Sequence, residues 1–303
     1  MNLFFNYSID CETPRDERFP NAAESWEVTE ASTRGFVGLM DELGVRDGAT
    51  LFVYPDVVTH QRALYRDMAD AGIEVALHLN GLRYSRLTGD RAQWLGAMDY
   101  EQQRDALKWG KADLEDAIGR PCLGYRACYG SANDATFAIL EELGFRWASN
   151  ASSRYRPEFH STWWGSWRYP HHASGQSQLI PGDLKLYEIP LTVGITVCYE
   201  GNTDQPLDLR AEAPVELVGA DRAAFRDIIS ENIVEMRRRH APVRAIIAGS
   251  HNTRLFGETD AHERHNVASV VEHTRALADE HEMTFLAGSF AHITDFAKAV
   301  GSY

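Results

Sequence analysis

Two carboxylates at the end of the first apolar stretch are the residues that point most directly to chemistry. Asp10 and Glu12 follow the mostly apolar residues 3–9, and Cys11 separates them. Side chains alternate between the two faces of a β-strand, so both carboxylates are predicted on one face and Cys11 on the other. Two acids on one face can share a cation or divide the roles of base and metal ligand.

Other reactive side chains also follow predicted strands. They are Asp56, His78, Asn80, Arg126, Ser149, Asn150 and His251. In a (β/α) barrel the carboxyl ends of all strands face one opening, whereas in an open sheet they are spread along an edge. Each residue alone has an ordinary structural explanation, but a set this rich in acid, histidine and arginine favours the barrel.

The elements that must position these side chains alternate between strands and helices. Strands are predicted at residues 3–9, 50–54, 73–79, 122–126, 145–148, 184–193, 244–248 and 283–286. Helical patterns lie between most of them, and irregular structure is predicted for 80–98 and for the polar stretch that reaches about 216. The alternation predicts one α/β domain over residues 1–303, a distorted (β/α)7–8 barrel of mostly parallel strands.

A long stretch without periodicity covers residues 149–183 and is rich in aromatic side chains. They are Tyr155, Trp163, Trp164, Trp167 and Tyr169. Such rings stack on sugar faces, but they also seal lids and oligomer interfaces, so a carbohydrate groove and a homo-oligomer contact both remain open.

Composition excludes several classes of protein. The net charge of -14 argues against nucleic acid as a partner, because nucleic-acid binding calls for a concentrated basic face. The longest apolar runs are strand-sized, so no membrane span is predicted. The four cysteines form no Cys-x-x-Cys pair. The start of the chain shows no basic leader, from which we expect a cytoplasmic protein.

Four segments together resemble the polysaccharide deacetylase (NodB-homology) family. Residues 124–136, GYRACYGSANDAT, are similar to its Arg-x-x-Tyr-Gly motif, and the helical pattern after them is similar to the helix that follows it. His78 resembles the first metal-binding histidine, and residues 8–12 resemble the N-terminal acidic motif. His251 resembles the late catalytic histidine. The order of the motifs holds over roughly residues 1–255, which identifies the chain as a divergent member.

The resemblance implies metal-dependent hydrolysis of an N-acyl group, usually the acetyl group of an amino sugar. Asp10 would be the base for a metal-activated water, and His251 would protonate the leaving amine. Arg126 would orient Asp10. A divalent ion lowers the pKa of its water and polarises the carbonyl, which fits a carboxylate base beside it.

The metal ligands implied by the resemblance are incomplete in this sequence. Glu12 and His78 match the family's ligand positions, but Leu82 stands where a second histidine is usual. Asn80 is a possible weaker ligand, and a loop histidine (His60, His160 or His171) or loss of the metal site are the alternatives. The expected metal is zinc, with cobalt or nickel possible.

The implied substrate is an N-acylated amino sugar or a glycan intermediate. Tyr129 would line the pocket, with its backbone N–H facing the oxyanion, and Trp147 and Asn150 are further candidates for substrate contact. Two other functions remain open. One is hydrolysis of a different amide or a cyclic imide, and the other is a catalytically silent protein that binds a saccharide or a partner.

Overall fold

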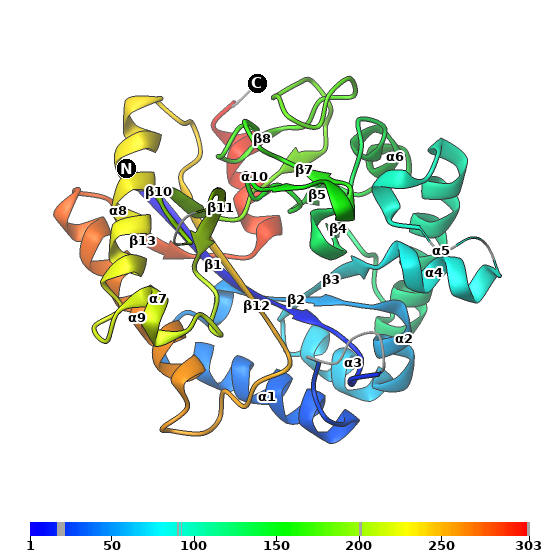
Figure 1. The fold of residues 1–303 in the computed structure, drawn as a ribbon, viewed down its shortest axis with the longest axis horizontal. Helices are drawn as coiled ribbons and strands as arrows, with labels where there is room; N and C mark the ends of the chain where they lie inside the picture. The colour runs from blue at the N-terminus through cyan, green and yellow to red at the C-terminus, as the bar shows by residue number, and fades with distance from the viewer. Residues whose placement is uncertain (17–21, 90, 92, 200–201, 302–303) are drawn as a thin grey trace. The chain divides into compact units, whose positions relative to one another are not determined.

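The computed structural model describes residues 1–16, 22–89, 91, 93–199 and 202–301 (Figure 1). The chain divides into two compact units. Unit 1 comprises Met1–Leu51 and Leu191–Ser289, and unit 2 comprises Phe52–Pro190 and Phe290–Tyr303. Strand β2 (Ala49–Val53) contributes residues to both units. The single domain over residues 1–303 stays a prediction.

The sheet of unit 1 is built on β1 (Asn2–Cys11), which is almost entirely buried. Both β12 (Ala245–His251) and β13 (Thr284–Ala287) pair with β1 in parallel, and β2 neighbours β1 in the strand order. Burial on both faces explains why residues 3–9 are mostly apolar without alternation. The register pairs Asp10 with His251, so these two residues lie next to each other at the carboxyl ends of adjacent strands.

Helices and one hairpin complete unit 1. The helices are α1 (Trp26–Glu42), η1 (Arg46–Gly48), α7 (Val215–Val218), α8 (Ala223–Arg238) and α9 (His262–Glu280). The hairpin pairs β10 (Val193–Tyr199) with β11 (Asn202–Asp208) in antiparallel orientation. The helix α9 packs on α8 and β13, and α8 also packs on β10.

The sheet of unit 2 continues from β2 in the order β2-β3-β4-β5-β9-β8. Its further strands are β3 (Glu74–Leu79), β4 (Gly124–Ala127), β5 (Trp147–Ala148), β9 (Tyr187–Glu188) and β8 (His171–His172). The pairs β3–β4, β4–β5 and β5–β9 are parallel, and β8–β9 is antiparallel. The predicted class, mostly parallel strands alternating with helices, is confirmed.

The helices of unit 2 begin and end where local chemistry allows. They are α2 (Pro55–His60), α3 (Arg62–Asp70), α4 (Gly81–Thr88), α5 (Tyr100–Ile118), α6 (Thr136–Glu142) and α10 (Phe290–Ala299), with the short turns η2 (Leu95–Ala97), η3 (Cys128–Gly130) and η4 (Pro157–Phe159). Asp99 and Gln102 form a capping box at the start of α5, and Gly119 ends α5 in the left-handed conformation. No helix in the described ranges is long and apolar enough to cross a bilayer.

Three predictions about elements were wrong. Residues 80–98 are not wholly irregular, because the Asn80 side chain caps α4 and Gly89 ends it. The strand predicted at 184–193 is only Tyr187–Glu188, and the stretch after it contains the β10–β11 hairpin rather than a loop alone.

The aromatic stretch 149–183 is largely irregular as predicted, with the short hairpin β6 (Tyr155–Arg156) and β7 (Ser161–Thr162) inside it.

Candidate active site

The acidic pair lies at the carboxyl end of β1 in unit 1. Cys11 is fully buried, whereas Asp10 and Glu12 are partly exposed, so the predicted alternation holds. Asn252 fixes this strand end, because its backbone N–H donates to the Asp10 carbonyl (3.1 Å) and its side-chain oxygen accepts from the Glu12 N–H (2.9 Å). The sequence reasoning missed Asn252, although it directly follows His251.

His251 forms an ion pair with a carboxylate that the sequence reasoning also missed. Its Nδ1 lies 2.6 Å from Oε1 of Glu212, and the Ser250 hydroxyl donates to the same carboxylate. A carboxylate only accepts, so Nδ1 carries a proton. Burial alone would lower the pKa of His251, but the charge and hydrogen bond of Glu212 raise it to about 9. His251 is therefore protonated at neutral pH.

Glu212 stays ionised despite its burial. Burial alone would raise its pKa, but the charge and hydrogen bond of His251, the charge of Arg210 and the hydroxyl of Ser250 lower it to about 2. The segment around Glu212 is held by α9, because the Asn266 side chain donates to the carbonyls of Ala211 (2.7 Å) and Ala213 (3.0 Å). The His251 imidazolium is therefore paired with a carboxylate whose backbone is held in place by Asn266.

In unit 2, His78 lies buried at the end of β3 with its ring fixed from two sides. Nδ1 lies 3.0 Å from the carbonyl of Arg126, and the ring stacks on Tyr54 with 4.7 Å between centroids. Since the carbonyl only accepts, Nδ1 carries a proton in this hydrogen bond. In a neutral ring this proton position is the one that binds a metal through Nε2.

Arg126 pairs with His78 in the strand register and is also buried. Its guanidinium donates to the carbonyl and the hydroxyl of Ser149 (both 3.1 Å) and lies over the Phe52 ring at 3.9 Å. These contacts fix the side chain within unit 2. Its role in orienting Asp10 stays a prediction.

Asn80 uses its side chain within unit 2. Oδ1 accepts a hydrogen bond from Leu82 N–H (3.0 Å) at the start of α4, and Nδ2 donates to the sulfur of Cys128 (3.4 Å). Cys128 also accepts from the Tyr54 hydroxyl (3.0 Å). The amide oxygen thus has a partner already, which argues against Asn80 as a strong metal ligand.

The three candidates for substrate contact lie in different environments. Tyr129 is 43% exposed, and its ring packs against Phe159 at 4.3 Å and Trp94 at 5.3 Å. Asn150 is buried, accepts from Ala127 N–H (2.7 Å) and donates its own N–H to Glu188 (2.7 Å). Its side chain therefore holds the backbone beside Arg126, which argues against substrate contact.

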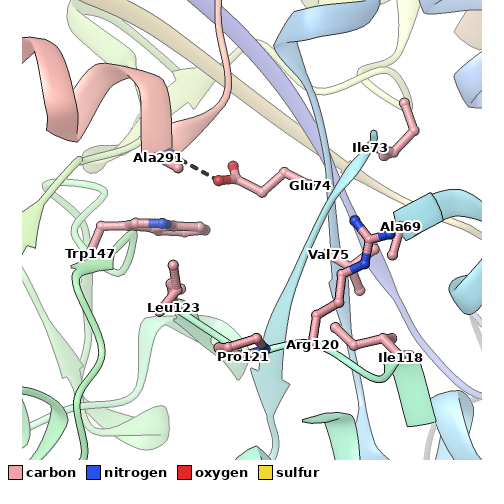
Figure 2. Close-up of a pocket in the computed structure, with 11 residues that line it drawn as sticks. Ala69, Ile73, Glu74, Val75, Ile118, Arg120, Pro121, Leu123, Trp147 and Ala291 are labelled. Atoms are coloured by element: carbon pink, nitrogen blue, oxygen red, sulfur yellow. Dashed lines mark hydrogen bonds between the residues drawn. The ribbon is translucent and has the colours of Figure 1, made fainter. Parts of the chain in front are cut away.

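Trp147 is a core residue. Its ring stacks on Phe290 at 4.7 Å and meets Phe52 edge-on, and a Cβ at Gly124 would come within 1.9 Å of it. The ring lines a cavity of about 160 Å³ that also contains Glu74, whose carboxylate accepts from the Ala291 N–H (Figure 2). Glu74 begins β3, so this cavity is at the opposite strand ends from His78. The placement argues against substrate contact by Trp147.

A buried carboxylate, Glu188, supports the strand ends of unit 2. Its Oε1 accepts from the N–H groups of Asn150 (2.7 Å) and Ala151 (2.8 Å). Burial raises the pKa of Glu188 to about 7, although these two donors and the charge of Arg126 oppose the shift. Its role is to hold the turn that follows β5. The sequence reasoning did not single it out.

The donors in unit 2 fit a transition-metal ion. A ligand nitrogen of His78 and the sulfur of Cys128 lie within 4.8 Å of each other. Imidazole and thiolate are the ligands that zinc and cobalt prefer. Hydrogen bonds to the Arg126 carbonyl and from Tyr54 fix the two side chains, as is usual around metal ligands.

A family model matches part of the chain. A family model described as "Polysaccharide deacetylase" matches residues 25–148, the part of the chain that contains His78, Arg126 and Tyr129. Over these residues the chain is similar to the polysaccharide deacetylase family. The matched segment excludes Asp10, Glu12 and His251, so the resemblance of those positions to the polysaccharide deacetylase motifs depends on the sequence alone. No curated protein matches the chain significantly.

Solved structures share the fold of this chain. A protein from Mycobacterium smegmatis described as a polysaccharide deacetylase aligns with a TM-score of 0.62 at 18% identity, over 98% of this chain and 91% of that chain. An allantoinase, PuuE, aligns with a TM-score of 0.64 at 14% identity, over 99% and 92%. At these identities the likeness shows the fold alone, and it agrees with the predicted (β/α)7–8 class.

Proposed function

We propose that this chain is a metal-dependent hydrolase that removes the N-acetyl group of an amino sugar. The observation that carries the proposal is the register of β1 and β12, which pairs Asp10 with His251. A carboxylate base and an imidazolium acid at neighbouring strand ends are the two proton-transfer groups that amide hydrolysis needs. The family match over residues 25–148 supports an acetylated carbohydrate as the substrate.

The proton transfers follow from the charge states. Asp10 accepts a proton from the water that attacks the acyl carbon. His251, held as imidazolium by Glu212, donates its Nε2 proton to the nitrogen of the departing amine as the C–N bond breaks. Arg126 orients Asp10, and the backbone N–H of Tyr129 donates to the oxyanion, for which one donor contributes about 3 kcal/mol in comparable sites.

We propose Glu12 and His78 as ligands of one divalent ion. Asn80, the third ligand expected from the sequence, is not part of this proposal, because its side-chain oxygen already accepts a hydrogen bond from Leu82 N–H. Zinc suits the imidazole best, and cobalt and nickel are alternatives. A bound ion supplies a lowered pKa for the attacking water and polarises the acyl carbonyl. The fixed tautomer of His78 supports its part in this assignment.

A cyclic substrate is the second candidate. The likeness to an allantoinase, which is named for a cyclic substrate, favours including a cyclic amide. The same groups would act on a ring, because ring opening also needs a base for water and an acid for the nitrogen. A silent saccharide-binding protein would need neither a metal nor a protonated His251.

The test is release of free amine by zinc-loaded protein from a panel of N-acetylated amino sugars, with allantoin as the cyclic comparison. We expect amine release from at least one acetylated sugar, loss of that activity after chelation, and its return when zinc is added. Ring opening of allantoin alone would support the cyclic alternative. Saccharide binding without turnover of any substrate would contradict both hydrolase proposals and support a catalytically silent saccharide-binding protein.

A further inference from the structure

The sulfur of Cys128 lies beside the predicted metal-binding histidine. Cys128 follows β4 at the start of η3 and is 3% exposed, and its sulfur is within 4.8 Å of a ligand nitrogen of His78. The two residues are carried by β3 and by the end of β4, which are hydrogen-bonded to each other in unit 2. Cys128 directly follows the paired residue Ala127, so its closeness to His78 follows from the β3–β4 pairing and the first residue of η3.

Surrounding groups hold both side chains in place. Tyr54 donates its hydroxyl proton to the sulfur (3.0 Å) while its ring stacks on His78. Asn80 donates to the same sulfur (3.4 Å). Cysteine binds metals through its sulfur as the thiolate. A single tyrosine thus contacts both candidate ligands, as residues around a metal site commonly do.

The other candidates for the missing ligand fit less well. Leu82 has no donor atom, and the oxygen of Asn80 already accepts from Leu82 N–H. Among the described residues, the cluster of metal donors around His78 includes Cys128 but none of the loop histidines His60, His160 and His171.

We propose that Cys128 is a ligand of the metal, in place of the histidine for which Leu82 stands. The proposal rests on the proposed function, because it assigns a ligand to the same ion. Cys128 lies within the segment that resembles the Arg-x-x-Tyr-Gly motif, at one of its unspecified positions. A thiolate is a softer ligand than imidazole or carboxylate, so the site selects zinc or cobalt over magnesium or calcium.

The test is the absorption spectrum of the protein stripped of metal and reloaded with Co²⁺. A sulfur ligand gives a charge-transfer band in the near ultraviolet, which nitrogen and oxygen ligands do not give. We expect this band in the wild type and its loss in Cys128→Ser, with zinc affinity at least about 10- to 100-fold weaker, the loss typical of removing a group around a metal. Cys198→Ser is the matched control and should keep the band.

A second measurement needs no variant, in case Cys128→Ser does not fold. X-ray absorption of zinc-loaded wild-type protein should show one sulfur at about 2.3 Å from zinc. Bound cobalt or zinc without a sulfur signal overturns the Cys128 assignment while leaving deacetylation untouched. A sulfur signal without amine release from any substrate overturns the proposed function and keeps the ligand. A wild type that binds neither metal contradicts both.

Discussion

Asp10→Asn is expected to lower kcat by about 10²- to 10⁴-fold while zinc remains bound. The amide has the shape of the carboxylate but cannot accept a proton from water, and a positioned base contributes a factor of this size. The measurement is kcat for amine release, with zinc content determined on the same samples. Asp47→Asn, at an exposed aspartate of η1, is the matched control and should leave both values unchanged.

Two results would contradict the role of Asp10. Activity within a few-fold of the wild type would mean that another group takes the proton. Loss of zinc together with loss of activity would make Asp10 a metal ligand, and the division of roles between Asp10 and Glu12 would then be reversed.

Glu212→Gln is expected to move the alkaline limit of activity to lower pH. In the wild type the pKa of His251 is raised to about 9, so the acid is protonated below that pH and is lost as the pH rises through it. The variant removes the largest charge that raises this pKa, while burial still lowers it and the charges of Glu12 and Asp10 still raise it, so the limb should move to lower pH. At pH 8 the variant should therefore keep a smaller share of its maximal activity than the wild type.

The measurement is the pH profile of kcat/KM, because this profile reports the acid and base of the free enzyme. If Glu212 had only a structural role, Glu212→Gln would reduce kcat/KM equally at every pH. If its charge raises the pKa of His251, the substitution moves the alkaline limb of the profile. Glu272→Gln, at an exposed glutamate of α9, should keep the wild-type profile. An alkaline limb that stays near pH 9 in Glu212→Gln would show that the acid is not His251.

Much of the fold could be predicted from the sequence, because the residues that end helices stand next to the elements that they end. Gly44, Gly72, Gly119 and Gly144 all have positive φ, and each follows a helix where the apolar pattern stops. The α4 helix was missed even though Asn80 and Gly89 mark its two ends, because Asn80 was interpreted only as a metal ligand. The strand predicted at 184–193 failed because its apolar residues are buried outside regular pairing.

The sequence pointed to candidate site residues only near strand ends, and their roles stay predictions. The structure places Asp10, His78, Arg126 and His251 in the last two residues of β1, β3, β4 and β12. Glu212 lies 39 residues before its partner His251, in a segment without periodicity, so nothing local marks it. Cys128 is visible in the sequence beside Arg126, but its closeness to His78 comes from the β3–β4 register, which a pattern of residue types does not give.

We propose that Glu12 and His78 bind one ion, and the zinc content of purified, zinc-loaded and dialysed protein tests this proposal most directly. We predict one zinc per chain in the wild type and in His160→Ala, and less than about a tenth of that in Glu12→Ala and in His78→Ala, since removing a ligand weakens binding strongly. Full zinc content in both ligand variants, or none in the wild type, would contradict the account.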